Sequence, residues 1–500
     1  MLKDFWSGDR ASRALLAIAL FLVLVGSRAA LVGYAGSQTP FMDEWDGDWN
    51  GLIWPYLQGR LTLDMLIAPF MEHRILFTRL MTLSLFNLSG YWDVLLQMIV
   101  NAILGAGGVV AVSFALARVL RGRFALAAIL SACLINVVPF SFDSILLGFN
   151  THFYLLPILS LLGLWLIAGG EAWSARWLAG ALAGAASFLC LASGALTLSA
   201  GIIVQLMQMA SGRRTGLREG LGVAALAGGA ALMVGFVPHV PESDACRARS
   251  VEEFLSALAT LAGWPAGDVF GLLLPLPSVV FCLRAVADRP DLRDARWFNI
   301  AALAWVGTQI ASLSFGRGQA PLQPRYLDIL MLGLTIHFVS ALWIVEARAL
   351  GEGRRTAPVA LVTWIALVGV ALPRAERHLP QRIEMWRDAI DAGGQNVRLY
   401  VATGDATYLA GRAAYSIPYN SPDKLRLFLD APEARASLPP ALLSHSAPRN
   451  RVEAFKRRFL RFAPVWISLG LVMLPIAVAR PRRRPVEFAA GGAPSERFSG

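Results

Sequence analysis

The sequence predicts an all-α polytopic membrane protein with about twelve transmembrane helices. Of its 500 residues, 56% are hydrophobic and only 16% are charged, and the mean hydropathy is +0.54. A soluble protein of this length carries more charge and fewer apolar residues. Apolar runs close to the roughly 20 residues of a spanning helix recur from one end of the chain to the other.

Twelve apolar runs define the predicted spans, and two local decisions set their number. The stretch 177–209 is predicted to cross twice, turning near Ser193 and Gly194, because basic residues flank both of its ends. The stretch 75–88 is short and follows the charged Arg74, so we expect a helix lying along the interface. The first run lacks a cleavage site followed by soluble sequence and is interpreted as a retained span. The spans are 14–34, 92–117, 124–141, 152–169, 177–192, 195–209, 218–236, 266–286, 297–314, 326–345, 356–373 and 462–479.

The basic residues between the spans predict the orientation. With alternating spans, the arginine clusters of the short loops all fall on one side, which the positive-inside rule makes the cytoplasm, with both termini there. The net charge of +11 therefore reflects topology and not binding to nucleic acid. These clusters lie before residue 14, at 118–123, at 176, at 213–218, at 284–296, at 348–355 and at 480–484.

The remaining regions are predicted to face the exoplasm. They are 35–91, 142–151, 237–265, 315–325 and 374–461. Residues 1–373 form the membrane domain with the first exoplasmic loop 35–91, and 462–479 is the last transmembrane helix. We interpret 374–461 as a small α/β subdomain, with a strand at 396–405 and a capped helix at 421–439. The tail 480–500 lies in the cytoplasm by the predicted orientation. After Arg484 it is rich in glycine, proline and alanine, a composition typical of disorder.

The four cysteines predict neither a disulfide framework nor a zinc site. They show no CxxC spacing, and three of them fall inside predicted spans. They are Cys133, Cys190, Cys246 and Cys282.

The first exoplasmic loop holds a cluster of acids that suits general-base chemistry. Aromatic residues interleave these acids and are expected at the membrane interface, where a lower dielectric strengthens a carboxylate as a base. Two alternatives remain open: Asp43 could cap a helix beginning near Trp45, or the D-E-x-D spacing could bind a divalent metal through oxygen ligands. The acids are Asp43, Glu44, Asp46 and Asp48, and the aromatics are Trp45, Trp49, Trp54 and Tyr56.

Three other exoplasmic groups are candidates for substrate binding. Glu72, His73 and Arg74 form either a salt-bridged turn or a group pointing back at the acidic loop. Arg317 and Arg325 lie in a short loop on the predicted exoplasmic side, where the positive-inside rule makes arginine uncommon. They suit a lipid phosphate, because each guanidinium donates paired hydrogen bonds. Contact with bulk anionic headgroups is the alternative for these arginines. The third group, Asp143, Asn150 and His152, is either a set of polar contacts or an ordinary interfacial turn.

The predicted layout resembles the GT-C superfamily of integral-membrane glycosyltransferases: an acidic motif in the loop after the first span, then interfacial helices, many further spans and an exoplasmic C-terminal portion. Five segments resemble more closely a group of bacterial membrane proteins. The segments are D-E-W at 43–45, E-H-R-I at 72–75, LLGFNTHF at 146–153, GRGQAPLQPRY at 316–326 and SIPY at 416–419. The resemblance implies a polyprenyl-phosphate-linked sugar donor, an acceptor in the cell envelope and a bacterial inner-membrane location. It also implies a catalytic acid in the first exoplasmic loop.

This resemblance and the residue patterns together predict the site. Asp43 is the expected general base and Glu44 the second choice. No cofactor is predicted, although the acidic loop leaves a divalent metal open. Substrate-binding positions are Asp46, Glu72, His73, Arg74, Asn150, His152, Arg317, Arg325 and Tyr326.

Two other functions fit the same sequence. One is a transporter or flippase of a lipid-linked or anionic substrate. Such proteins usually hold their key ionisable groups inside spans and show repeats, whereas here the groups cluster in loops and no repeat is visible. The other is a non-catalytic partner in the assembly of envelope polysaccharide.

Overall fold

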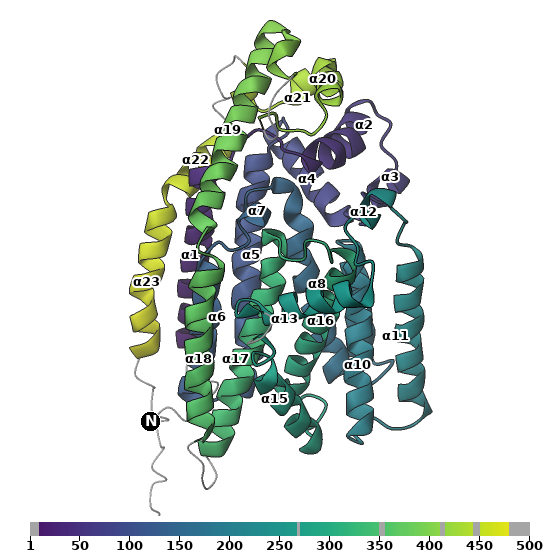
Figure 1. The fold of residues 1–500 in the computed structure, drawn as a ribbon, viewed down its shortest axis with the longest axis vertical. Helices are drawn as coiled ribbons and strands as arrows, with labels where there is room; N and C mark the ends of the chain where they lie inside the picture. Colours follow the sequence, from purple (N-terminus) through teal and green to yellow (C-terminus); the bar gives the residue numbers. More distant parts are fainter. Residues whose placement is uncertain (1–9, 268–270, 350–355, 411–415, 444–450, 480–500) are drawn as a thin grey trace, which may run out of the picture.

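The computed structural model describes residues 10–267, 271–349, 356–410, 416–443 and 451–479. Within these ranges the chain is helical and contains no β-strand, only one isolated bridge between Phe70 and His73. Long helices run side by side in one bundle, and short helices gather at one end of it, the upper end in Figure 1. We call this the loop end. The arrangement confirms an all-α polytopic membrane protein.

Eight described helices are long and apolar enough to cross a membrane, or nine if the bent pair α22–α23 counts as one span. Eleven of the twelve predicted runs coincide with helices, and the twelfth, 266–286, does so only from residue 276. Three of the helices are short, so the count of twelve spans stays a prediction. The short ones are α6 (Gly122–Val137), α9 (Ala175–Ser187) and α15 (Leu276–Ala287). The long ones are α1 (Arg10–Ala35), α5 (Val94–Leu116), α8 (Thr151–Gly169), α10 (Ala195–Ala210), α11 (Leu217–Gly235), α16 (Ala295–Gly316), α17 (Leu327–Ala349) and α18 (Thr356–Ala375), with α22 (Arg451–Arg461) and α23 (Ala463–Ala479) as the bent pair.

Small residues bring the first and last helices together. A Cβ at Gly26 of α1 would lie 2.7 Å from the side chain of Ile467, and a Cβ at Gly470 of α23 would lie 2.6 Å from the Ala19 carbonyl oxygen. Lipid chains are as apolar as leucine, so close backbone packing of this kind is a main source of attraction between membrane helices. The two helices lie side by side at the left of Figure 1.

The loop end is built by several short helices and by the projecting helix α19 (Leu379–Thr403). The segment α18–α19 covers 48 residues, or about 70 Å, which is more than twice the hydrocarbon thickness of a bilayer. Much of α19 therefore projects from the bundle, as Figure 1 shows. The other elements here are the π-helix η1 (Trp45–Ile53), α2 (Trp54–Leu57), α3 (Leu63–Ile67), α4 (Leu76–Ser89), α7 (Phe142–Ile145), α12 (Pro241–Asp244), α20 (Pro422–Asp430) and α21 (Pro432–Ser437).

The prediction of an α/β subdomain at 374–461 is wrong within the described residues. The stretch 396–405, predicted as a strand, continues α19, which ends at Gly404 in the left-handed conformation. Its buried side chains Ile383, Ile390 and Val397 recur every seven residues, the spacing of one face of a long helix. The cap of the helix predicted at 421–439 is confirmed, since the Ser421 side chain accepts a hydrogen bond from the Lys424 amide. The helix is not continuous, because extended backbone at Ala431 divides it into α20 and α21.

Two tryptophans of the first loop lie in a protein core. Trp45 and Trp49 are fully buried and pack against Trp92, and Trp45 also stacks on Phe428 of α20. These two rings therefore contact protein and not lipid headgroups, whereas Tyr56 is exposed. This core fixes η1 between the start of α5 and the C-terminal helices, and so it determines where the acids of the loop point.

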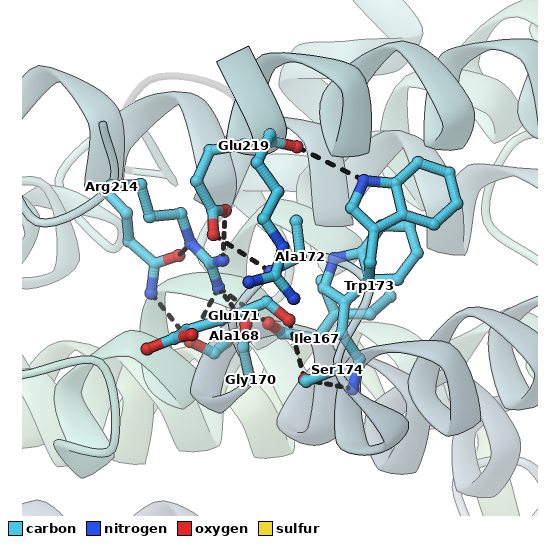
Figure 2. Close-up of polar contacts among 12 residues, drawn as sticks. Ile167, Ala168, Gly170, Glu171, Ala172, Trp173, Ser174, Arg214 and Glu219 are labelled. Carbon is cyan, nitrogen blue, oxygen red and sulfur yellow. Dashed lines mark hydrogen bonds and ion pairs between the residues drawn. The ribbon is translucent and has the colours of Figure 1, made fainter. Parts of the chain in front are cut away.

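The opposite end of the bundle is closed by a buried ion pair. Arg214, between α10 and α11, lies 2.6 Å from Glu219, and its guanidinium also donates to the carbonyl oxygens of Ile167 and Gly170 (Figure 2). Glu219 in turn accepts a hydrogen bond from the Ala172 amide. Because nearly every polar atom of the pair is hydrogen-bonded, burial is tolerated and the two connecting loops are held together.

Candidate functional site

A cavity of about 430 Å³ lies at the loop end of the bundle. Its wall combines the first loop, the start of α8, the end of α16 and the start of α17. Eight of the eleven residues predicted for the site line it, although they come from four separate stretches of chain. These are Asp43, Glu72, His73, Asn150, His152, Arg317, Arg325 and Tyr326.

Asp43 faces this cavity because the chain turns sharply just before it. Met42 has a positive φ of 46°, and its amide donates to the Pro418 carbonyl, which anchors the turn to the C-terminal segment. Asp43 itself does not cap the following helix: Glu44 occupies the cap position, without a side-chain capping bond. The Asp43 side chain is accessible from the cavity yet surrounded by protein atoms. This desolvation raises its pKa, and Arg325 counteracts the rise.

The second predicted group forms a tight turn beside the acidic loop. Phe70 and His73 exchange backbone hydrogen bonds, which leaves Glu72 at the tip and 3.6 Å from Arg317. The His73 Nδ1 atom accepts a hydrogen bond from the Ala192 amide, so its proton is on Nε2. Burial lowers the pKa of His73 to about 4, and the imidazole is neutral at pH 7.

Arg317 and Arg325 are only loosely held by protein carboxylates. The Arg325 Nε atom lies 3.8 Å from Asp143 and has no hydrogen-bond partner among the described residues. Its side chain keeps 42% of its surface exposed. Burial raises the pKa of Asp143 to about 6, which Arg325 opposes. Loose pairing leaves both guanidiniums free to bind an anion without first breaking strong ion pairs.

Two polar residues on and before α8 complete the wall. The His152 Nδ1 atom lies 3.1 Å from the Thr78 hydroxyl, which fixes its ring. Asn150 donates to the Asp143 carbonyl at 3.3 Å. Both side chains are buried. The rest of the surface is largely apolar and includes Leu156, Trp305, Ile329 and Leu332.

Three predicted residues lie outside the cavity and bind other parts of the protein. Glu44 is fully buried and accepts hydrogen bonds from the amides of Phe41 and Phe149, and burial raises its pKa to about 8. Asp46 pairs with Lys424 and Tyr419 of the C-terminal segment.

The third of these residues is Arg74. Its guanidinium donates to the carbonyl oxygens of Ile67 and Phe236 and lies over the Phe236 ring.

Sequence reasoning missed Arg247, Gln309 and Asp328, which also line the cavity. Asp328 carried a signal, since an ionisable residue at the start of an apolar run is a functional candidate by default. Arg247 lies in a long loop, to which the positive-inside rule does not apply. Gln309 is an ordinary polar residue within a predicted span. Only the fold brings these two to the site.

The arrangement places a carboxylate, two available guanidiniums and the neutral imidazole of His73 around one partly apolar space. It can bind an anionic headgroup and accept a proton from a neighbouring hydroxyl group. Within the described ranges, no three His, Cys, Asp or Glu side chains are grouped closely enough to hold a metal ion. Comparison of the chain with protein-family models, curated proteins and solved structures finds no match to any of them.

Proposed function

We propose that this membrane protein is a glycosyltransferase that moves a sugar from a polyprenyl-phosphate donor to a hydroxyl group of an envelope glycan, lipid or protein. The observation that carries the proposal is the meeting of Asp43 and the loosely paired Arg325 in one cavity. An apolar wall beside this pair suits a lipid-linked donor. The resemblance of the predicted layout, with its acidic first loop, to GT-C enzymes points in the same direction.

In the proposed reaction, Asp43 accepts the proton of the acceptor hydroxyl as its oxygen attacks the anomeric carbon. The bond from that carbon to the phosphate oxygen breaks, and polyprenyl phosphate leaves with the electron pair. Arg325 and Arg317 stabilise the negative charge that develops on this phosphate. Direct attack inverts the anomeric configuration. His73, neutral with its proton on Nε2, is a hydrogen-bond donor for sugar or phosphate oxygens.

The proposal assigns Glu44 and Arg74 to positioning, because their side chains bind backbone groups outside the cavity. It also includes the topology of the sequence prediction: α6, α9 and α15 cross the membrane, the loop end faces the exoplasm and both termini are cytoplasmic. The bacterial inner membrane is the location that this requires. The arginine clusters of the short loops support that orientation.

A second candidate function is transport of a lipid-linked or anionic substrate. It is favoured by Arg28 and Asp328, ionisable residues that lie within predicted spanning helices and line internal cavities. Transporters commonly place such groups inside the membrane.

Glycosyl transfer is tested with the chain purified in detergent and supplied with a polyprenyl-phosphate sugar pool and acceptor extracts. Asp43→Asn keeps the shape of the loop but loses the proton acceptor, and the rate is expected to fall about 10²–10⁴-fold. Donor binding survives, since the arginines hold the phosphate. The wild-type rate rises with pH through the raised pKa of Asp43, because the ionised form is the base. Asp64→Asn, an exposed change outside the cavity, is the matched control.

The arginines and the metal alternative are tested in the same assay. Arg325→Ala weakens use of the donor, and Arg325→Lys recovers only part of it, because an ammonium group cannot donate paired hydrogen bonds. Loss of activity on chelation with EDTA would assign the acidic loop to a metal site instead of a base. If Asp43→Asn turns over at the wild-type rate, transport becomes the better explanation of the cavity.

A further inference from the structure

A second, smaller cavity lies inside the helix bundle next to the first. Its volume is about 100 Å³, and the two cavities share four lining residues: Phe153, Pro157, Asp328 and Leu332. It is lined by α1, α5, α6, α8 and α17. Arg28 of α1 projects into it seven residues before the end of that helix, about 10 Å below the loop end.

Two buried side chains of this smaller cavity, Arg28 and Tyr154, have polar atoms without a hydrogen-bond partner among the described residues. Arg28 is only 4% exposed, and its Nε and Nη1 atoms meet no hydrogen-bond acceptor among the described residues. The Tyr154 hydroxyl is buried beside it and also has no partner within those ranges. A buried guanidinium with unused N–H groups is costly, so such a group marks a site that a ligand completes.

The surrounding helices are shaped to hold the guanidinium in place. It lies over the Tyr154 ring, with 5.6 Å between Cζ and the ring centroid. A Cβ on Gly105 of α5 would lie 2.6 Å from Arg28 Nη1 and 2.8 Å from the Tyr154 ring. Only glycine leaves room for this stack. Three helices thus cooperate to present unpaired donors to one small space.

The charge around the pocket restricts the ligand. Asp328 lines the same space, but its carboxylate accepts a hydrogen bond from Ser141 at 2.7 Å and forms no ion pair with Arg28 within the described chain. Because the Asp328 carboxylate is so near, a ligand with two negative charges is disfavoured relative to one with a single negative charge. The volume of about 100 Å³ is several times the roughly 10–15 Å³ that one water molecule needs, so the pocket has room for a small polyatomic anion.

We infer that Arg28, Tyr154 and Gly105 form an intramembrane pocket for a monoanionic phosphate group, either the phosphodiester of a lipid headgroup or free monobasic phosphate. The pocket is separate from the Arg317 and Arg325 pair, and it does not depend on glycosyl transfer. Its ligand enters through the larger cavity, which shares its wall.

The test uses the full chain in detergent, in a background that carries Arg247→Gln, Arg317→Gln and Arg325→Gln, so that the larger cavity keeps none of the arginines that line it. Saturable binding of radiolabelled inorganic phosphate and of short-chain phosphatidylglycerol is measured. Arg28→Gln and Gly105→Ala are expected to weaken binding at least about tenfold, since hydrogen bonds to a charged group are lost or blocked. Gly107→Ala is the matched control on the same helix, because a Cβ there meets nothing within 4 Å.

A melting curve without ligand separates loss of a site from loss of the fold. Arg28→Gln should melt at the temperature of its background or above it, because an unpaired buried charge has been removed. Preference for phosphatidylglycerol assigns the pocket to a lipid headgroup, and preference for inorganic phosphate assigns it to the free ion. The inference is overturned if the background protein binds neither ligand, if Arg28→Gln binds as tightly, or if Arg28→Gln melts far below its background.

Discussion

Replacing Asp48 by asparagine should remove much of the pH dependence of stability in this protein. Asp48 is fully buried in η1, where its Oδ1 atom accepts a hydrogen bond from the Thr82 hydroxyl at 2.9 Å. Its Oδ2 atom has no hydrogen-bond partner among the described residues. Burial raises the pKa of Asp48 to about 7 from the usual 3.8. Asparagine keeps the shape and the Thr82 bond but cannot ionise.

The magnitude follows from this shift. A pKa shift of about three units corresponds to roughly 4 kcal/mol in the free energy of unfolding. This is an upper value, because water entering the site would reduce the shift. The folded protein holds the proton more tightly than the unfolded chain does. The stabilisation is therefore complete below about pH 4 and is lost as the pH rises to about 7. Glu44, with a pKa raised to about 8, adds a loss of the same sign, and the charge of Asp48 is one of its causes.

The assay is unfolding in mixed detergent micelles, followed at several values between pH 4 and 8. Relative to Asp48→Asn, the wild type should lose stability as the pH rises across this range. The slope that remains in Asp48→Asn comes from other groups, among them Glu44 and Asp143, whose raised pKa values act in the same direction, and His73, whose lowered pKa acts in the opposite one. A constant offset between the two proteins is allowed, because the new amide nitrogen is itself buried. Asp64→Asn, an exposed carboxylate, should follow the wild-type curve. Parallel curves for wild type and Asp48→Asn would refute the reasoning.

Two other predictions concern the C-terminal helices and the topology. Lys456 is buried and lies 2.7 Å from Asp93, so Lys456→Met should destabilise the protein by about 3–5 kcal/mol in the same unfolding assay, with partial recovery in the double variant with Asp93→Asn. Equal stability of Lys456→Met and wild type would contradict this. The topology test uses a Cys246→Ser background, because Cys246 is exposed in a loop that is predicted to face the exoplasm. In it, a cysteine at the exposed Asp64 should react with an impermeant maleimide on intact cells, and one at Gly216 should react only after lysis. Labelling of Gly216→Cys from outside would reverse the orientation.

Much of the candidate site was predictable because its residue types conflict with their surroundings. Asp43 and Glu72 are acids beside a bilayer, and Arg317 and Arg325 are cations on the side that positive charge avoids. Such conflicts are visible in a sequence without any contact information. Glu44 shows the limit of this reasoning, since it stands next to Asp43 but points away and binds the Phe149 amide. Adjacent residues can carry the same charge while their side chains point to different parts of the protein.

The sequence by itself determined the helical membrane class, because the length and apolarity of a segment decide whether it can cross a bilayer. It did not determine the structure of 374–461, where Val397 and its neighbours suit a strand locally but are buried along one face of the long helix α19. Nor did it place Trp45 in a core with Phe428, which lies nearly 400 residues away. Above all, only the fold put Arg28 against Tyr154 and left its donors unpaired. Whether a buried charge has a partner depends on the packing of distant helices, and that packing is set by three-dimensional fit and not by local pattern.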